Sequence, residues 1–325
     1  MTKTVVITLC RTRESDVSAA AGQLGNLGQE RVQPARAGSQ HSRWSHLLYV
    51  APFLFLYVTL LVYPLFAGFW LSLHKADFFG GSRFVGFENF VRLSNDKVFV
   101  GAVGNTFYFI LLTVPALALI GLGLALALNR QTRTAAFLRG VFFSSSVLSV
   151  TIVTLLWRVV FAPDGGFLSN VLQAFDRTPV AFLSDAKLAL PAIAITTIWW
   201  CIGLPMMLFL AALQQVPREL YEAAALDHAG RWKTLWHVTL PSIRRTFALV
   251  VIIEVVLQFQ LFGQAYLMTQ GGPNNASRPL VLFIFEVGFN RWDVGYAIAA
   301  GQVLFGLIAI AAFAQYLVAR RKEAF

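Results

Sequence analysis

The chain has 325 residues, of which 57% are hydrophobic and only 13% are charged. Soluble proteins carry about twice this share of charged residues, and the mean hydropathy here is +0.64. Several apolar runs are also long enough to cross a bilayer. These features exclude an ordinary cytosolic enzyme, a disordered chain and a nucleic-acid-binding domain, and they indicate a protein that crosses the membrane several times.

Residues 1–46 contain only one short apolar run, Val5 to Leu9, followed by a charged and Gly/Gln/Ser-rich stretch. This run is too weak for a spanning helix or a cleavable signal peptide. We predict a disordered cytoplasmic tail, with a misassigned start codon as the alternative, and a single membrane domain over 47–325. Cys10 lies in the tail and Cys201 in an apolar run, so neither a disulfide framework nor a paired-cysteine metal site is indicated.

Six hydrophobic segments follow the tail, and each has about the 20 residues that a bilayer crossing requires. Their apolar residues are continuous and do not alternate, so the segments are predicted to be helices and the fold to be an all-α, polytopic membrane protein. Pro64, Pro115 and Pro205 predict local kinks. The segments are 47–73, 99–128, 140–161, 188–212, 247–264 and 295–319.

Lysine and arginine are unevenly divided between the two sets of connections. One set, including 31–46 of the tail, contains fourteen of them, whereas the opposite set contains eight. Because cytoplasmic loops are enriched in these residues, both termini are predicted to be cytoplasmic, in a bacterial-type inner membrane. The Arg320-Arg321-Lys322 cluster would anchor the C-terminus. This distribution accounts for the net charge of +10 without a nucleic-acid partner.

The loop between the fourth and fifth segments is polar, yet its apolar residues have helical spacing. Pro217 is a favourable helix start, and a break near Gly230 precedes a second short helix through Trp232. We therefore predict a helix-turn-helix across the inner face of the membrane. Its alanines are small enough to enter a groove on another protein, and Glu222 and Asp227 offer carboxylates to basic partners.

Within this loop, Glu222-Ala223-Ala224 is followed at the expected separation by Val238-Thr239-Leu240-Pro241. The pattern resembles the cytoplasmic signature of the membrane permease subunits of binding-protein-dependent ABC importers. That signature has a glycine four positions after its second alanine, where this chain has His228, with Gly230 two residues later. The exact site of the turn between the two helices therefore stays open.

The resemblance extends over nearly the whole chain after residue 47, with a family core at about 99–319, and it is closest to the carbohydrate-uptake group typified by the maltose and glycerol-3-phosphate permeases. Five further pieces carry it in the expected order. They are Tyr63-Pro64, Phe84-Val85-Gly86-Phe87-Glu88-Asn89-Phe90, Gly104-Asn105-Thr106, Leu156-Trp157-Arg158 and Leu267-Met268-Thr269-Gln270-Gly271-Gly272-Pro273.

The resemblance implies a permease subunit that forms half of the translocation pathway for a sugar or related polyol. The implied partners are a second permease subunit, an ABC ATPase dimer, an extracytoplasmic solute-binding protein and the lipid bilayer. The chain has no Gly-x-x-x-x-Gly-Lys-Ser/Thr phosphate loop, so ATP is expected to bind a separate subunit and this chain to be neither an enzyme nor cofactor-dependent. The implied ATPase-coupling residues are Glu222, Ala223, Ala224, Asp227, Gly230, Leu240 and Pro241.

Polar residues inside hydrophobic segments are costly, so they indicate functional or helix-packing roles. The fifth segment is the richest, and its amides and carboxylate offer hydrogen bonds to sugar hydroxyls, with hydrogen bonding between helices as the alternative. Asn105 favours such a structural role, and at least one of Trp199 and Trp200 is expected to pack. The candidates for the substrate pathway are Glu254, Gln258, Gln260, Gln264, Asn105 and Trp199.

Two other classes of membrane protein fit the sequence less well. A secondary transporter would use Glu254 as a proton or cation site, but inverted repeats and broken mid-membrane helices are not evident. An integral-membrane enzyme would bring clustered catalytic residues to one face, and none is evident. His74, His228 and His237 lack the spacing of metal ligands, so no metal site is expected.

Overall fold

The computed structural model describes residues 43–76 and 80–321. The chain divides into two units, 1–64 and 65–325. Most of the predicted tail, and Lys322 of the basic cluster, lie outside the described residues. Helix α2 begins at Arg43, within the range assigned to the tail.

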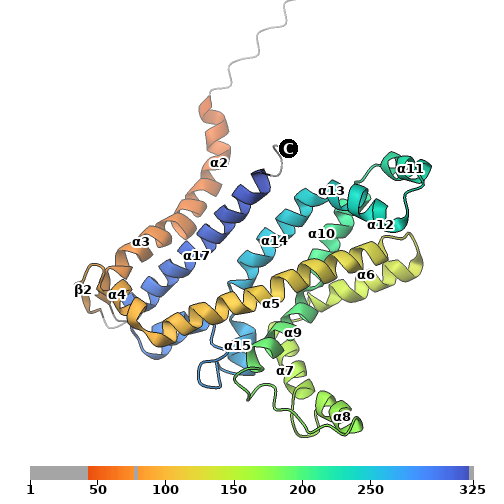
Figure 1. The fold of residues 1–325 in the computed structure, drawn as a ribbon. Helices are drawn as coiled ribbons and strands as arrows, with labels where there is room; N and C mark the ends of the chain where they lie inside the picture. Colours follow the sequence, from red (N-terminus) through yellow and green to blue (C-terminus); the bar gives the residue numbers. More distant parts are fainter. Residues whose placement is uncertain (1–42, 77–79, 322–325) are drawn as a thin grey trace, which may run out of the picture. The chain divides into compact units, whose positions relative to one another are not determined.

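The described residues are mostly helical, as predicted, with one two-stranded hairpin as the exception (Figure 1). The first unit contains α2 (Arg43–Tyr57) and the π-helix η1 (Val58–Val62), and the chain continues into α3 (Tyr63–Ser72), most of which belongs to the second unit. The hairpin pairs β1 (His74–Ala76) with β2 (Ser82–Phe84), and His74 lies opposite Phe84.

The remaining helices belong to the second unit. They are α4 (Glu88–Asn95), α5 (Lys97–Leu128), α6 (Arg133–Ser145), α7 (Val150–Val160), α8 (Phe167–Ala174), α9 (Ala189–Cys201), α10 (Gly203–Gln214), α11 (Arg218–Leu226), α12 (Arg231–Thr234), η2 (Leu235–Thr239), α13 (Leu240–Ser242), α14 (Arg244–Gln258), α15 (Gly263–Met268), α16 (Leu280–Phe285), η3 (Glu286–Asn290) and α17 (Val294–Arg321).

Three helices within the described ranges are individually long and apolar enough to cross a membrane: Tyr49–Ser72, Lys97–Leu128 and Val294–Val318. Two further crossings are available only if bent pairs count as one, α6 with α7 at 95° and α9 with α10 at 45°. The third predicted segment is thus not a single straight helix. The fifth, 247–264, is also wrong as a continuous span, because α14 ends at Gln258 and α15 begins at Gly263.

The prolines act differently from one another. Pro64 follows the π-helix η1, where the N–H of Tyr63 bonds to the carbonyl of Val58. The wider π-turn accommodates proline, because the proline ring has no N–H to donate and would crowd the carbonyl four residues earlier in an α-helix. Pro205 follows the 45° bend between α9 and α10. Pro115 lies inside α5, which the structure describes as one uninterrupted helix.

The bend between α6 and α7 lies against the bend between α9 and α10, and hydrogen bonds connect the two. The hydroxyl of Ser145 donates to the carbonyl of Trp200 at 3.2 Å, and that of Ser146 donates to the same carbonyl at 3.0 Å. In return, the indole N–H of Trp200 donates to the carbonyl of Leu148 at 3.1 Å. Backbone groups released where the helices break therefore find partners in the neighbouring bend, as a low-dielectric environment requires.

Helix α5 is central to the second unit, where it contacts α9, α10, α14 and α16 and runs beside α6 (Figure 1). Leu117 and Ala125 on its inner side are fully buried, whereas Leu111 and Leu119 are 68% and 63% exposed. An exposed apolar side on a helix of this length fits lipid or another membrane subunit.

The connection 265–294, predicted to be an outer loop, contains an apolar helix that the sequence analysis missed. Helix α16 and η3 together span Leu280–Asn290, shorter than a crossing requires. Leu280, Phe283 and Val287 are buried against α4, α5 and α17. This segment is therefore part of the core, and the loop prediction was wrong there.

Candidate functional site

The predicted helix-turn-helix consists of α11, followed by α12 and η2. At the end of α11, the N–H of Ala229 bonds to the carbonyl of Ala224 at 2.9 Å, and the N–H of His228 bonds to that of Ala225 at 3.1 Å. This pair of bonds defines a Schellman cap, in which the residue just past the helix adopts the left-handed conformation. That residue is His228, with φ of 51°.

The open question about the signature glycine is answered by this cap. The turn lies at His228, the signature's glycine position, and a glycine there would adopt a positive φ without steric cost. Gly230 instead has φ of −66° and precedes the first residue of α12. A β-carbon added to Gly230 would meet no atom within 4 Å, so the geometry does not require glycine at that position.

The signature residues divide between the inside and the outside of the helix-turn-helix. Ala224 is buried, whereas Glu222, Ala223 and Asp227 are exposed. Large apolar side chains share the exposed surface: Leu226 is 82% and Trp232 is 75% exposed. We call this the α11–α12 surface, and its large apolar members are Leu220, Leu226, Trp232 and Trp236.

The Leu-Pro end of the signature shapes the return into the next helix. The N–H of Leu240 bonds to the carbonyl of Leu235, which closes the π-helix η2 just before Pro241, as η1 precedes Pro64. Thr239 Oγ1 donates to the hydroxyl of Tyr221 at 3.4 Å and so links η2 to α11. Leu240 is half-buried against the core, while Pro241 is exposed.

The polar residues of the fifth segment do not share one environment. Glu254 is 1% exposed, and its carboxylate accepts a hydrogen bond from Gln258 Nε2 at 3.0 Å. Gln264 is also buried, with Nε2 3.5 Å from Thr197 Oγ1 on α9. Gln260 is exposed, and among the described residues its side chain bonds to the carbonyl of Val256 at 3.4 Å. The structure therefore brings Glu254 and Gln258 together and separates Gln260 from them.

Asn105 has a structural role in this conformation. Its amide Nδ2 donates to the carbonyls of Asn275 and Arg278 at 2.8 and 3.0 Å. At the next residue, the hydroxyl of Thr106 accepts a hydrogen bond from the N–H of Leu280 at 2.9 Å. These bonds fasten the segment before α16 to α5.

Trp199 is 41% exposed, and its ring meets that of Trp157 edge-on, with centroids 5.8 Å apart. The indole nitrogen of Trp157 is buried without a hydrogen-bond partner in the described part of the chain. A buried donor of this kind is costly unless another molecule satisfies it. Trp157 was noticed in the sequence only as part of the Leu156-Trp157-Arg158 piece.

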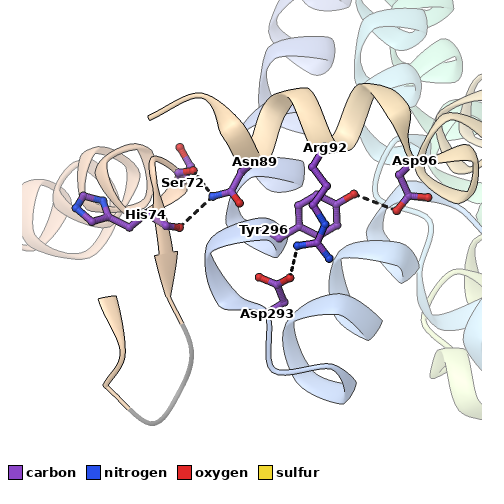
Figure 2. Close-up of polar contacts among 7 residues, drawn as sticks. All are labelled: Ser72, His74, Asn89, Arg92, Asp96, Asp293 and Tyr296. Atoms are coloured by element: carbon purple, nitrogen blue, oxygen red, sulfur yellow. Dashed lines mark hydrogen bonds and ion pairs between the residues drawn. The ribbon is translucent and has the colours of Figure 1, made fainter. Parts of the chain in front are cut away.

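A polar cluster around α4 was missed by the sequence analysis (Figure 2). Arg92 forms a 2.6 Å ion pair with Asp293 and lies 4.0 Å from the centre of the Tyr296 ring. The Tyr296 hydroxyl donates to Asp96 Oδ2 at 3.0 Å, while Asp96 Oδ1 accepts from the first turn of α5. Asn89 Nδ2 donates to the carbonyls of Ser72, at the end of α3, and of His74.

The spacing of Asn89, Arg92 and Asp96 marks one face of a helix and was readable in the sequence. The partners of Arg92 and Asp96 are Asp293 and Tyr296, about 200 positions away, and a single sequence offers no signal for such a pairing. The cluster joins the ends of α3, α5 and α17. Among the described residues, no group of three or more His, Cys, Asp or Glu side chains is placed to hold a metal ion.

Residues 94–324 match the family of binding-protein-dependent transport system inner membrane components. The chain belongs to this family. The permease is 32% identical over 265 residues to the probable ABC transporter permease protein YurN of Bacillus subtilis, covering 78% of this chain and 91% of YurN. It is 33% identical over 268 residues to the diacetylchitobiose uptake system permease protein NgcF of Streptomyces coelicolor, covering 78% of this chain and 75% of NgcF.

The fold of the permease is similar to a chain in the crystal structure of a bacterial ABC transporter involved in the import of the acidic polysaccharide alginate. The TM-score is 0.75 at 22% identity, over 86% of this chain and 96% of that one. The resemblance inferred from the sequence is therefore confirmed: the protein is a membrane transport subunit of the ABC importer type. A secondary transporter is disfavoured, and the family is one of transport components, consistent with a protein that is not an enzyme.

Proposed function

We propose that the permease forms half of the translocation pathway of an ATP-driven importer for a sugar or related polyol. Its partners would be a second, similar permease subunit, an ATPase dimer that binds and hydrolyses ATP, and an extracytoplasmic solute-binding protein. Two permease subunits are needed because one chain encloses only part of a pathway. The relative NgcF is named for diacetylchitobiose uptake, and the solved transporter of similar fold is described as importing alginate; both are carbohydrates.

The observation that carries the coupling part of the proposal is the α11–α12 surface. It exposes large apolar side chains beside Glu222 and Asp227, and apolar patches rimmed by charge are typical of protein interfaces. We propose that the ATPase subunit covers this surface, with Ala223 in contact and Ala224 setting the packing of α11 from within. ATP-driven closure of the ATPase dimer would then move the helix-turn-helix and switch the pathway between inward-open and outward-open states.

We propose six crossings, with both termini and the helix-turn-helix in the cytoplasm. The crossings are α2–α3, α5, the bent pair α6–α7, the bent pair α9–α10, α14 extended by α15, and α17. The uneven distribution of lysine and arginine supports this orientation. Under it, the α4 cluster lies outside, where the solute-binding protein would dock, and the short α16–η3 segment is covered by protein.

We propose that the pathway is lined in another state of the cycle by Glu254, Gln258, Gln264 and Trp199. The burial of Glu254 and Gln258 supports this indirectly, since a carboxylate with one neutral partner inside a span is costly and is retained where it serves a function. The ring of Trp199 can stack on a sugar face. Gln260, a further polar candidate, is left out of this set, because the hydrogen bond that its side chain makes within the described residues is a local one to Val256.

Uptake by a reconstituted complex with its ATPase and binding protein tests the proposal. Glu222→Lys reverses a charge on the α11–α12 surface, so we expect solute-stimulated ATP hydrolysis to be abolished while the protein stays in the membrane. Asp164→Lys makes the same charge change at an exposed position on another loop and should leave coupling intact. Normal coupling in Glu222→Lys would contradict the docking role.

Labelling in intact cells tests the orientation separately. A cysteine at Ala223 should react with a membrane-impermeant maleimide only after permeabilisation, whereas a cysteine at Asp164 should react in intact cells. The unsubstituted chain measures the background from Cys10 and Cys201. Reaction of the Ala223→Cys variant in intact cells would place the helix-turn-helix outside and refute the proposed topology.

A further inference from the structure

A second polar site lies at the base of α11, in a pocket of about 550 Å³. Its walls come from the end of α5, from α6, from the end of α10 and from the start of α11. Three of its lining residues are arginines and none is acidic. The residues that matter for the argument are Asn129, Arg130, Arg139, Gln214, Arg218 and Tyr221.

The three guanidinium groups share a pocket whose lining residues include no carboxylate. In the described part of the chain, none of Arg130, Arg139 and Arg218 forms an ion pair. Arg139 is also half-buried, so its charge is less screened by water than that of a freely exposed side chain. Like charges that converge on one pocket repel one another, and a bound anion removes that cost.

The neutral groups in the pocket also favour an anion rich in oxygen. Asn129 and Gln214 offer amide N–H donors. The hydroxyl of Tyr221, 3.4 Å from Thr239 Oγ1, is a further group that can donate a proton to an anion. Planar guanidinium groups bind phosphate through paired N–H donors. The pocket thus combines charge and donors suited to a phosphate group.

The position of the pocket indicates where that phosphate comes from. The apolar helix α5 ends at Leu128, and α10 ends at Gln214. Both pocket residues Asn129 and Gln214 therefore lie where candidate membrane spans stop, which is the level of lipid headgroups. Basic pockets between helices at this level bind anionic lipid headgroups.

We propose that this pocket binds the phosphate group of an anionic phospholipid and thereby holds the base of α11 at the membrane boundary. The site is separate from the solute pathway, and its occupancy does not depend on which solute the importer carries. A free phosphate compound offers the same chemistry, so the experiment must distinguish the two sources.

Native mass spectrometry of the purified full chain, with added phosphatidylglycerol or phosphatidylcholine, tests the site. We expect phosphatidylglycerol to be retained more strongly, and Arg139→Gln combined with Arg218→Gln to weaken its binding by about fivefold for each arginine removed. The control is Arg133→Gln, which removes one positive charge from α6 outside the pocket and should change binding by less than about twofold, against about fivefold for one pocket arginine. Phosphatidylcholine binding should be the same in all variants.

Competition with inorganic phosphate separates the sources. Displacement of phosphatidylglycerol only by other anionic lipids supports the headgroup, whereas displacement by millimolar phosphate, with the same dependence on Arg139 and Arg218, supports the site with free phosphate as its ligand. Equal retention in the double variant and the unsubstituted chain would overturn the proposal. The proposal would also be overturned if Arg133→Gln weakened phosphatidylglycerol binding as much as the double variant does. The same holds if the double variant lost binding to the ATPase subunit while its lipid retention was unchanged.

Folding of the double variant is checked by its thermal midpoint. Should it fail to fold, Arg139→Lys takes its place, because it keeps the charge and removes the planar fork. We expect this variant to bind phosphatidylglycerol more weakly than the unsubstituted chain. Binding equal to that of the unsubstituted chain would show that Arg139 makes no paired contact with phosphate.

Discussion

Gly203 is the position where a single added carbon should do the most damage to the helix crossing. It begins α10, directly after the bend, and a β-carbon there would lie 2.7 Å from the carbonyl oxygen of Phe142 and 2.8 Å from Cα of Phe143. Both atoms belong to the backbone of α6, so a side-chain rotation cannot relieve the contact. The two helices would have to separate by several tenths of an ångström.

The size of the effect follows from two opposing terms. Replacing glycine by alanine in a helix gains about 1 kcal/mol when nothing interferes, while forcing an extra carbon into close-packed backbone costs about 1–3 kcal/mol or more. We therefore expect Gly203→Ala to lower stability by up to about 2 kcal/mol. Gly123→Ala on α5 is the matched control, because its β-carbon would meet no atom within 4 Å.

The thermal midpoint of the purified full chain, followed by tryptophan fluorescence at one heating rate, measures the difference. Gly203→Ala should unfold below the unsubstituted chain, and Gly123→Ala at or above it. Because the Ser145 and Ser146 hydroxyls bond across the same crossing, we also expect faster proteolysis near the α6–α7 bend. A Gly203→Ala variant as stable as Gly123→Ala would refute the close approach of α6 and α10.

Three further substitutions test other parts of the structure. His228→Gly should stabilise the α11 cap by about 0.5–1 kcal/mol, because glycine adopts a positive φ freely. The control His237→Gly, inside η2, should destabilise the protein by about 1 kcal/mol. The thermal midpoints of the two variants measure this difference. Arg92→Gln should destabilise by about 1 kcal/mol through the lost ion pair and ring contact, and less at high salt. Glu254→Gln should leave the thermal midpoint unchanged or raise it, because a buried charge is removed, but should alter the solute affinity of reconstituted uptake.

Each of these has an outcome that contradicts it. Loss of stability in His228→Gly would mean that the imidazole makes a contact that matters more than the backbone strain. If Arg92→Gln and Asp293→Asn had effects that simply add in the double variant, the two side chains would not interact. Unchanged uptake kinetics in Glu254→Gln would assign Glu254 and Gln258 to helix packing.

The sequence predicted best where apolar runs are long and uninterrupted. The expected segments 99–128 and 295–319 correspond to α5 at Lys97–Leu128 and α17 at Val294–Arg321. Local patterns were also informative: the helix-turn-helix follows from Pro217, the alanines and the aromatic residues after Gly230. In these cases the forces that determine the structure act between residues close together in the chain.

The failures share a physical origin. Hydropathy shows how long an apolar segment is. It does not show which distant residue forms hydrogen bonds with the backbone groups that are unpaired where a helix breaks. The α6–α7 bend depends on hydrogen bonds that Ser145 and Ser146 form with Trp200. Trp200 is more than 50 positions away from both serines. The turn residues Gly271-Gly272-Pro273, which precede the α16–η3 segment, led to the prediction of a loop. The hydrogen bonds that hold the start of this segment come from Asn105 and Thr106 on α5.

Trp232 and Trp236 of the α11–α12 surface lie on one nearly continuous helical path with the buried Glu254. From η2 the chain passes through α13 into α14, with a single interruption in this stretch at Ile243, which is 2% exposed and packs into the core. Glu254 lies about 15 Å along α14 from Arg244, at 1.5 Å per residue. Under the proposed function, a displacement of α12 therefore reaches Glu254 along a helix axis, with Ile243 as the one non-helical residue between them.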